Sequence, residues 1–136
     1  MKKKALVIGT KGTSRDIDWP LDLDAMQKCV GGLIQYVRDA KGKEIVLPNG
    51  SLGVMRECIV NEEGLMLGLD PNVLASLFVN GGDINGIYNL VGPAIVVYEE
   101  RDGSGADYIN KSIMDALSNI LDEKRVVIHL GDFEEE

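Results

Sequence analysis

The pattern of apolar and polar residues at the start of the chain predicts a β-hairpin followed by a short helix. Residues 4–9 have the apolar and β-branched content of a short strand, and the turn TKGTS returns the chain into a second strand at residues 15–19. The segment PLDLDAMQKCVGG then repeats its apolar residues at helical spacing. Asp22 is placed to cap this helix, and the glycines at positions 31 and 32 are placed to end it.

The middle of the chain alternates short strands with turns rich in Pro, Asn and Gly. LIQYVRD alternates as a strand, and KEIVLPNGSLGV places two arms around a Pro-Asn-Gly turn, as a hairpin or as a loop excursion. RECIVNEEGLMLGL predicts a further hairpin, with residues 57–60 running in, residues 61–64 turning and residues 65–69 running out. In DPNVLASLFVN, Asp70 is placed as a cap before Pro71 at the first helical position, so we expect a short helix, with a strand as the alternative.

The late segment PAIVVYEE has the clearest strand pattern in the chain. Its apolar run is nearly continuous, which is typical of a central strand covered on both faces. Beyond it, SGADYINKSIMDALSNILDEK repeats apolar residues at helical intervals and predicts the longest helix, and RVVIHL predicts a final strand. Between the two, ERDGSG at residues 100–105 is a candidate hinge.

These elements indicate the α+β class, with a mixed or mainly antiparallel sheet, short helices on one side of it and a C-terminal helix-strand extension. The 136 residues, 45% of them hydrophobic, suit one domain overall. Within it we expect an α+β core at residues 1–99 and, at residues 100–136, a C-terminal helix and strand packed on the core or on a neighbouring subunit. Because the apolar face of the last helix needs cover, we expect a homodimer.

Composition and charge narrow the function classes. The formal net charge of −8 disfavours direct nucleic-acid binding, because phosphate neutralisation needs a basic surface. It fits plain solubility, a basic protein partner or mimicry of DNA. The first apolar run is too short for a secretion signal and no stretch is long enough to span a membrane, so we expect a cytoplasmic protein. Cys29 and Cys58 are then expected to be buried, reduced thiols.

The candidate catalytic residues do not form a catalytic set. Glu62 and Glu63 are adjacent at the predicted hairpin tip, where neighbouring side chains point in different directions. A hairpin tip is also too exposed to water to give the two carboxylates the different environments that an acid/base pair needs. A solvated turn or a polar ligand contact is therefore favoured over an acid/base pair. His129 is the only histidine and lacks partners at metal-ligand spacing, and no serine lies in a GxSxG motif. We expect no catalytic residue, no metal and no cofactor, and an enzyme is the least favoured class.

The segment NGGDINGIYN is the strongest candidate for a ligand site. It surrounds Tyr88 with glycines and asparagines, so that amides can bond a polar edge while the ring stacks on a nucleotide-like or peptide ligand. A long loop rich in turn formers is the alternative. An anionic ligand would need local cations, for which Arg38, Lys41, Lys43 and Arg56 are candidates. The predicted ligand-binding residues are Asn61, Glu62, Glu63, Asn72, Asp83, Asn85, Tyr88, Arg38 and Arg56.

Three motifs occur in the order LDAMQKCVGGLIQYV, VNEEGLMLGLDPN and GPAIVV. Together they resemble a family of small, functionally unassigned proteins that is common in phages, prophages and other mobile elements, and the resemblance covers residues 4–97. The recurring positions of that family fall on Gly31, Gly32, Asn61, Glu62, Glu63, Gly64, Leu69, Asn72, Gly92 and Pro93. The inserted PNGSLGVMR segment and the C-terminal helix and strand depart from the pattern, so nothing is carried over to them.

The resemblance implies an accessory protein of a mobile element, located in the host cytoplasm, that acts by binding. The favoured function is sequestration of a small nucleotide-like ligand, such as a host-defence signal, which would make this a counter-defence protein. The alternative is an acidic inhibitor or DNA mimic that binds a host protein. The expected partners are thus a small molecule or a host protein, with neither a membrane nor direct contact with nucleic acid.

Overall fold

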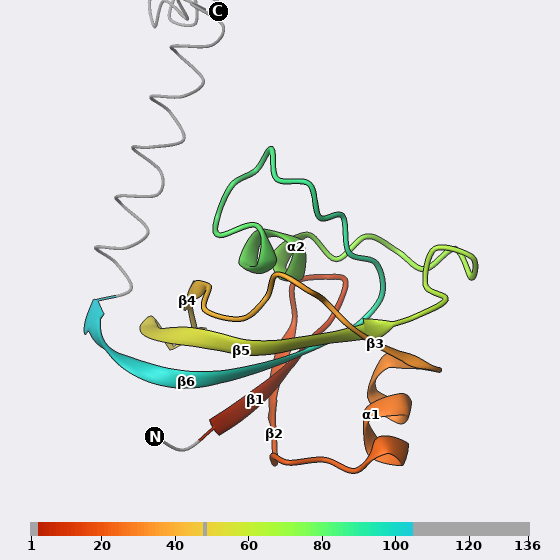
Figure 1. Cartoon of the computed structure of the whole chain (residues 1–136), viewed down its shortest axis with the longest axis horizontal. Helices are drawn as coiled ribbons and strands as arrows, with labels where there is room; N and C mark the ends of the chain where they lie inside the picture. The colour runs from red at the N-terminus through yellow and green to blue at the C-terminus, as the bar shows by residue number, and fades with distance from the viewer. Residues whose placement is uncertain (1–2, 48, 105–136) are drawn as a thin grey trace, which may run out of the picture. The chain divides into compact units, whose positions relative to one another are not determined.

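An antiparallel sheet forms the centre of the computed structural model, which describes residues 3–47 and 49–104 (Figure 1). This part of the chain contains six strands and two helices. In chain order they are β1 (Lys3–Ile8), β2 (Ser14–Ile17), α1 (Leu23–Val30), β3 (Ile34–Tyr36), β4 (Glu44–Val46), β5 (Ser51–Asn61), α2 (Val73–Val79) and β6 (Ala94–Ser104).

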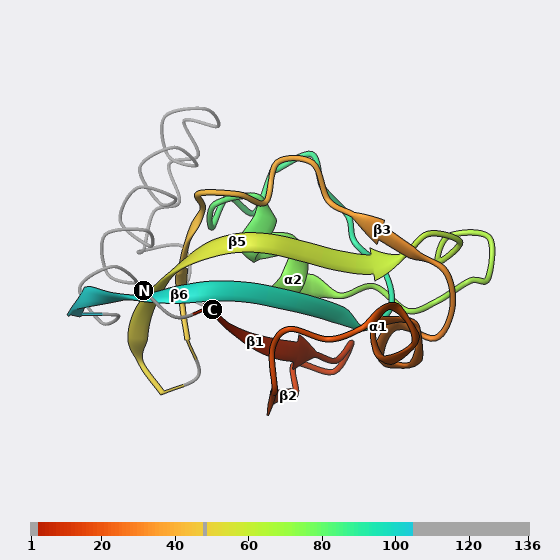
Figure 2. The same cartoon turned by 60° about the horizontal axis from the view of Figure 1, so that its bottom comes forward.

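The two long strands, β5 and β6, lie next to each other in the middle of the sheet (Figure 2). The strand order is β2-β1-β6-β5-β3, and every pair is antiparallel. On its other edge, β5 pairs with β4 along its first residues, where Val46 lies opposite Leu52, and with β3 at its end, where Ile34 lies opposite Asn61. Both edges of β5 are therefore occupied.

Apolar side chains cover both faces of β6, as the PAIVVYEE pattern predicts. Ala94, Val96 and Tyr98 point to one face, where they meet residues of α2 such as Ala75 and Val79. The intervening side chains of β6 point to the opposite face, where they meet residues of α1. The two helices accordingly lie on opposite sides of the sheet (Figure 1). We refer to these as the α2 face and the α1 face.

The α+β class with a mainly antiparallel sheet is confirmed, but the two helices divide between the faces instead of sharing one side. The reason lies in β6, whose apolar residues occupy both alternating sets of positions, so that each face needs its own cover. The alternative of a strand at residues 73–79 is excluded, because these residues form α2.

Local signals place the ends of α1 as predicted. The Asp22 carboxylate accepts a hydrogen bond from the backbone N–H of Ala25 at 2.8 Å, and Gly31 adopts a left-handed conformation with φ 83°. In α2 the prediction is wrong by two residues, since Asn72 caps the helix and Asp70 does not. Asp70 precedes Pro71, which forms an isolated β-bridge with Val91.

Strands β4 and β5 form a hairpin, which favours the first of the two alternatives for this region, whereas the hairpin predicted at residues 57–69 is wrong. Residues 62–68 make consecutive turns, in which the N–H of Leu67 donates to the carbonyl of Glu63 at 2.9 Å. A returning strand has no place here, because β3 and β6 already occupy both edges of the end of β5.

The C-terminal helix predicted from Ser104 onward, the strand RVVIHL and His129 lie outside the described residues, apart from Ser104 itself. Strand β6 runs through residues 100–104, which make up most of the candidate hinge. The boundary between a core at residues 1–99 and a C-terminal part stays a prediction. Among the described residues, no helix is long and apolar enough to cross a membrane.

Candidate functional site

Asn61 is buried at the end of β5 and connects two of the three sequence motifs. It is 4% exposed. Its Nδ2 donates to the carbonyl of Val30 at 3.2 Å, and its Oδ1 accepts from the N–H of Glu63 at 2.8 Å. A Cβ added to Gly32 would lie 2.9 Å from the same Nδ2. The Val-Gly-Gly end of α1 and the Asn-Glu-Glu-Gly turn therefore pack directly on each other through this amide.

Asn72 is fully buried and has a similar internal role. Its Nδ2 donates to the carbonyls of Ile8 at 3.0 Å and Gly92 at 2.8 Å, and its Oδ1 accepts from the N–H of Ala75 at 3.1 Å. All these partners are in the protein, so Asn72 offers no surface to a ligand.

Glu62 and Glu63 occupy the turn that follows β5. Glu62 is exposed and Glu63 is half-buried, and neither carboxylate makes a hydrogen bond or ion pair with another described residue. The backbone of the turn is fixed, since the N–H of Glu62 donates to the carbonyl of Leu33 at 2.8 Å. This arrangement leaves the two carboxylates available to a partner.

The predicted cations Arg38 and Arg56 do not converge on one site. Arg56 lies at a β-bulge in β5 and forms an ion pair with Glu99 at 3.2 Å. Its Nε is buried and has no hydrogen-bond partner in the part of the chain that the structure describes. Arg38 is exposed between β3 and β4, and its charge offsets only part of the rise in the pKa of Tyr88 that the hydrogen bond to Asp39 causes.

The loop from Asn80 to Asn89 is held together by its own polar groups. The Asn80 side chain makes two hydrogen bonds with the backbone of Tyr88: its Nδ2 donates to the Tyr88 carbonyl at 2.9 Å, and its Oδ1 accepts from the Tyr88 N–H at 3.0 Å. The Tyr88 hydroxyl donates to Asp39 at 2.6 Å, and this hydrogen bond is the main cause that raises the pKa of Tyr88. Asp83 accepts from the N–H of Asn85, and both residues are exposed.

This loop, α2 and the turn after β5 together line a groove of about 340 Å³, which we call the aliphatic groove. Leucine, isoleucine and valine side chains form much of its lining, and the loop contributes polar residues beside them. The lining includes Leu65, Val73, Leu77, Ile84, Tyr88 and Asp83. Of the predicted ligand-binding residues, Asp83 and Tyr88 thus share one site, whereas Arg56, Asn61, Asn72 and both glutamates lie outside its lining.

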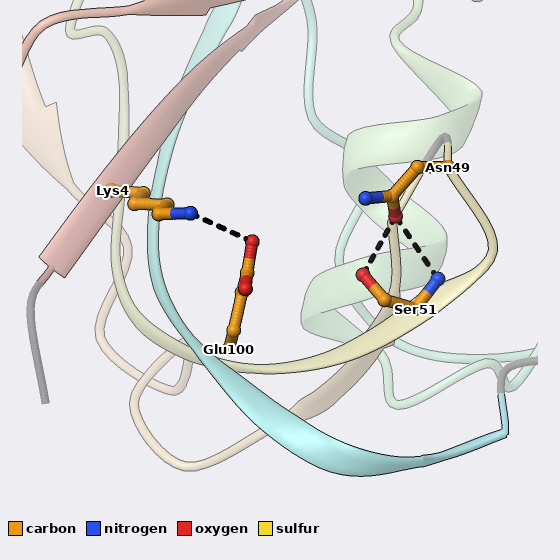
Figure 3. Close-up of polar contacts among 4 residues, drawn as sticks. All are labelled: Lys4, Asn49, Ser51 and Glu100. Carbon is orange, nitrogen blue, oxygen red and sulfur yellow. Dashed lines mark hydrogen bonds and ion pairs between the residues drawn. The ribbon is translucent and has the colours of Figure 1, made fainter.

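A second groove, of about 810 Å³, was not foreseen from the sequence, and we call it the charged groove. Its walls include the start of β1, strand β2 and the β4–β5 turn. Lys4 donates to Glu100 at 2.9 Å, and across the groove Asn49 accepts two hydrogen bonds from Ser51 (Figure 3). The pairing of β1 with β6 sets Lys4 opposite Tyr98, a relation between distant segments that no local pattern indicates.

The part of the chain that the structure describes holds two free cysteines and no cluster of metal ligands. Within residues 3–47 and 49–104, no group of three or more His, Cys, Asp or Glu side chains could hold a metal ion. Cys29 and Cys58 are both free, as predicted, but only Cys58 is buried and Cys29 is half-buried.

Comparison with known proteins identifies a family for this chain. A family described as "Domain of unknown function (DUF3846)" matches residues 1–121. No curated protein and no solved structure matches the chain. The resemblance to a functionally unassigned family is thereby confirmed at that level. Because the match extends over most of the 136 residues, the chain belongs to the DUF3846 family.

Proposed function

We propose that this chain is an accessory protein of a mobile element that binds a host protein, and that the aliphatic groove is its binding site. The observation that carries the proposal is the exposure of large aliphatic side chains at this groove. Leu65, Val73 and Ile84, which line it, are 79%, 65% and 62% exposed. A cluster of exposed apolar side chains around a groove is typical of a protein-binding surface.

The polar groups of the loop at residues 80–89 are poorly suited to recognising a nucleotide-like ligand. The Asn80 amide and the Tyr88 hydroxyl already bond within the protein, to Tyr88 and Asp39 respectively. Among the described residues, no Lys or Arg lines the aliphatic groove, so a phosphate would find no cation there. These observations favour a protein partner over a nucleotide at this site.

The charges around the aliphatic groove indicate the kind of partner that fits it. Asp83 lines the groove, and Glu62 and Asp70 are exposed near the segments that form it. The chain as a whole carries a formal charge of −8. A partner segment with aliphatic side chains flanked by Lys or Arg would match both features, and its association should slow as salt is added.

The mobile-element role rests on the resemblance of the three sequence motifs to a family common in phages and prophages. In that setting a binding protein acts by occupying a surface that the host protein needs. An inhibitor of a host protein therefore fits both the family resemblance and the aliphatic groove.

Affinity capture with matched variants tests the proposal. Wild-type protein, Leu65→Glu and Ile84→Glu are immobilised and exposed to lysate of the bacterial host, and retained proteins are quantified by mass spectrometry. The control is Leu23→Glu, because Leu23 on α1 is also exposed, at 54%, but lies outside the aliphatic groove. We expect a host protein that wild type and Leu23→Glu retain and that both groove variants lose. The purified partner should then bind with the same ranking in calorimetry.

Two results would contradict this function. If all four proteins retain the same set, the aliphatic groove has no part in binding. If light scattering shows that wild type and Leu23→Glu are dimers and that the groove variants are monomers, the groove is covered by a second copy of the chain.

A further inference from the structure

The charged groove contains a tyrosine whose ring is buried and whose hydroxyl has no hydrogen-bond partner among the described residues. Tyr98 is 5% exposed and lines the groove from β6. Its ring packs against β5, where a Cβ added to Gly53 would lie 3.3 Å from Cδ2. The hydroxyl makes no hydrogen bond with another residue in the described ranges, and it is not one of the buried polar atoms there, so it is accessible from the groove although the ring is buried. A fixed ring thus presents an unused donor and acceptor to the groove.

The charges around this hydroxyl are predominantly negative. Strand pairing puts Asp16 opposite Leu6 and Lys4 opposite Tyr98, so these side chains share the α2 face. Lys4 is already neutralised by Glu100 at 2.9 Å. Asp16 has no ion pair with any described residue. Burial, and then the carboxylates of Asp16 and Glu100, raise the pKa of Tyr98, which keeps the hydroxyl protonated.

The basic residues of the groove lie toward the other side of the sheet. Arg15 pairs with Val7 and Lys3 pairs with Glu99, and both positions belong to the α1 face. Among the described residues, Asp16 on the α2 side has no ion pair, and neither has Asp18, which also lines the groove, whereas Lys4 on the α2 side is already paired with Glu100. An anionic ligand is disfavoured at the Tyr98 hydroxyl, and a cationic group is favoured.

We propose that the charged groove binds a small ligand with a primary ammonium group, which donates to the Asp16 carboxylate and the Tyr98 hydroxyl. The volume of about 810 Å³ suits a metabolite-sized molecule. Leu6 and Leu47, which also line the groove, supply apolar contact for the carbon chain of an aliphatic amine. Asn49 uses its Oδ1 for Ser51, and its Nδ2 is left to donate to an acceptor on the ligand. This site is separate from the aliphatic groove and does not rest on the function proposed above.

Titration with 1,4-diaminobutane, followed by protein NMR, tests the site. We expect saturable shift changes at Leu6, Asp16 and Tyr98, and none of them with the neutral analogue 1,4-butanediol. Tyr98→Phe keeps the ring and Asp16→Asn keeps the shape of the side chain. Each should weaken binding on the order of tenfold, the effect of one hydrogen bond to a charged group.

Asp83→Asn is the matched control, because it removes one exposed carboxylate outside the charged groove. It should change the affinity by less than about twofold, as a distant screened charge does. Equal weakening by Asp83→Asn and Asp16→Asn would show general attraction to an acidic protein and overturn the site. Equal binding of the diol, the absence of saturable shifts, or binding of inorganic phosphate at the same residues would also overturn it.

Discussion

The side-chain amide of Asn72 donates to the carbonyls of both Ile8 and Gly92, at 3.0 and 2.8 Å. Ile8 ends β1 and Gly92 precedes β6, so one side chain joins the ends of two neighbouring strands. The oxygen of the same amide caps α2 through the N–H of Ala75. The fold thus concentrates three connections in a single residue that has no exposed surface.

Asn72→Asp should unfold the protein more easily even though aspartate is a good helix cap. The new carboxylate can still accept from Ala75, but it faces the carbonyl oxygens of Ile8 and Gly92 without a hydrogen to donate. We expect a loss of about 3 kcal/mol in the free energy of unfolding, measured by urea denaturation. Asn85→Asp, at an exposed position, should change it by less than about 0.5 kcal/mol. If Asn72→Asp is as stable as wild type, helix capping alone accounts for the contribution of Asn72 to stability.

Asn61→Ala should also lower stability, whereas its neighbour Glu62 should tolerate the same change. Alanine removes the donor to Val30 and the acceptor for the N–H of Glu63, both in a buried setting. A loss of about 1–3 kcal/mol is expected. Glu62→Ala removes an exposed side chain and should stay within about 0.5 kcal/mol. The two variants are compared in urea; equal losses would contradict the structural role of Asn61.

Local patterns predicted the elements whose ends are set by adjacent residues. Helix α1 is an example, since Asp22 and Gly31 fix its two ends through bonds within the helix. Residues 65–69 show the opposite case. Their pattern suits a strand, but whether a strand forms there depends on an edge of β5 that β3 already occupies. Pairing between distant segments is not encoded in a local pattern, and this is where the prediction failed.

The same limit applies to the candidate site. The motif positions were found from the sequence, yet several of them pack on one another. A Cβ at Gly64 would lie 2.8 Å from Val91, and one at Gly92 would lie 2.7 Å from Leu69. Such contacts suggest that the family motifs mainly maintain the fold. The residues that form both grooves are brought together by the sheet, and nothing in the spacing of Lys4 and Tyr98 indicates that they are neighbours.

The ion pair between Arg56 and Glu99 should make stability depend on pH in the acid range. The hydrogen bond from Arg56 is the main cause that lowers the pKa of Glu99 below its ordinary value of 4.5. A group whose pKa is lower in the folded state stabilises the protein above its unfolded pKa, and the stabilisation is lost as the pH falls through the folded value. Wild type should therefore be more stable than Glu99→Gln near pH 7, and the difference should disappear below the folded pKa of Glu99.

Urea denaturation of both proteins from pH 7 down to pH 3 measures this difference. Glu62→Gln serves as the control, because the Glu62 carboxylate is exposed and has no hydrogen bond or ion pair with another described residue. It should show no comparable change relative to wild type. A difference between wild type and Glu99→Gln that grows as the pH falls would contradict the assignment.

The two cysteines should react with a thiol reagent at very different rates. Cys58 is fully buried in the core on the α2 face, and burial raises its pKa to about 12. At pH 8 roughly one Cys58 thiol in 10⁴ would be the reactive thiolate, and the reagent has no access to it in the folded state. Cys29, on α1, is half-buried and can be reached. With Ellman's reagent at pH 8, one thiol per chain should react quickly and the second only in urea. Cys29→Ser should abolish the fast phase; a fast phase that survives in this variant would mean that the core around Cys58 opens in the native protein.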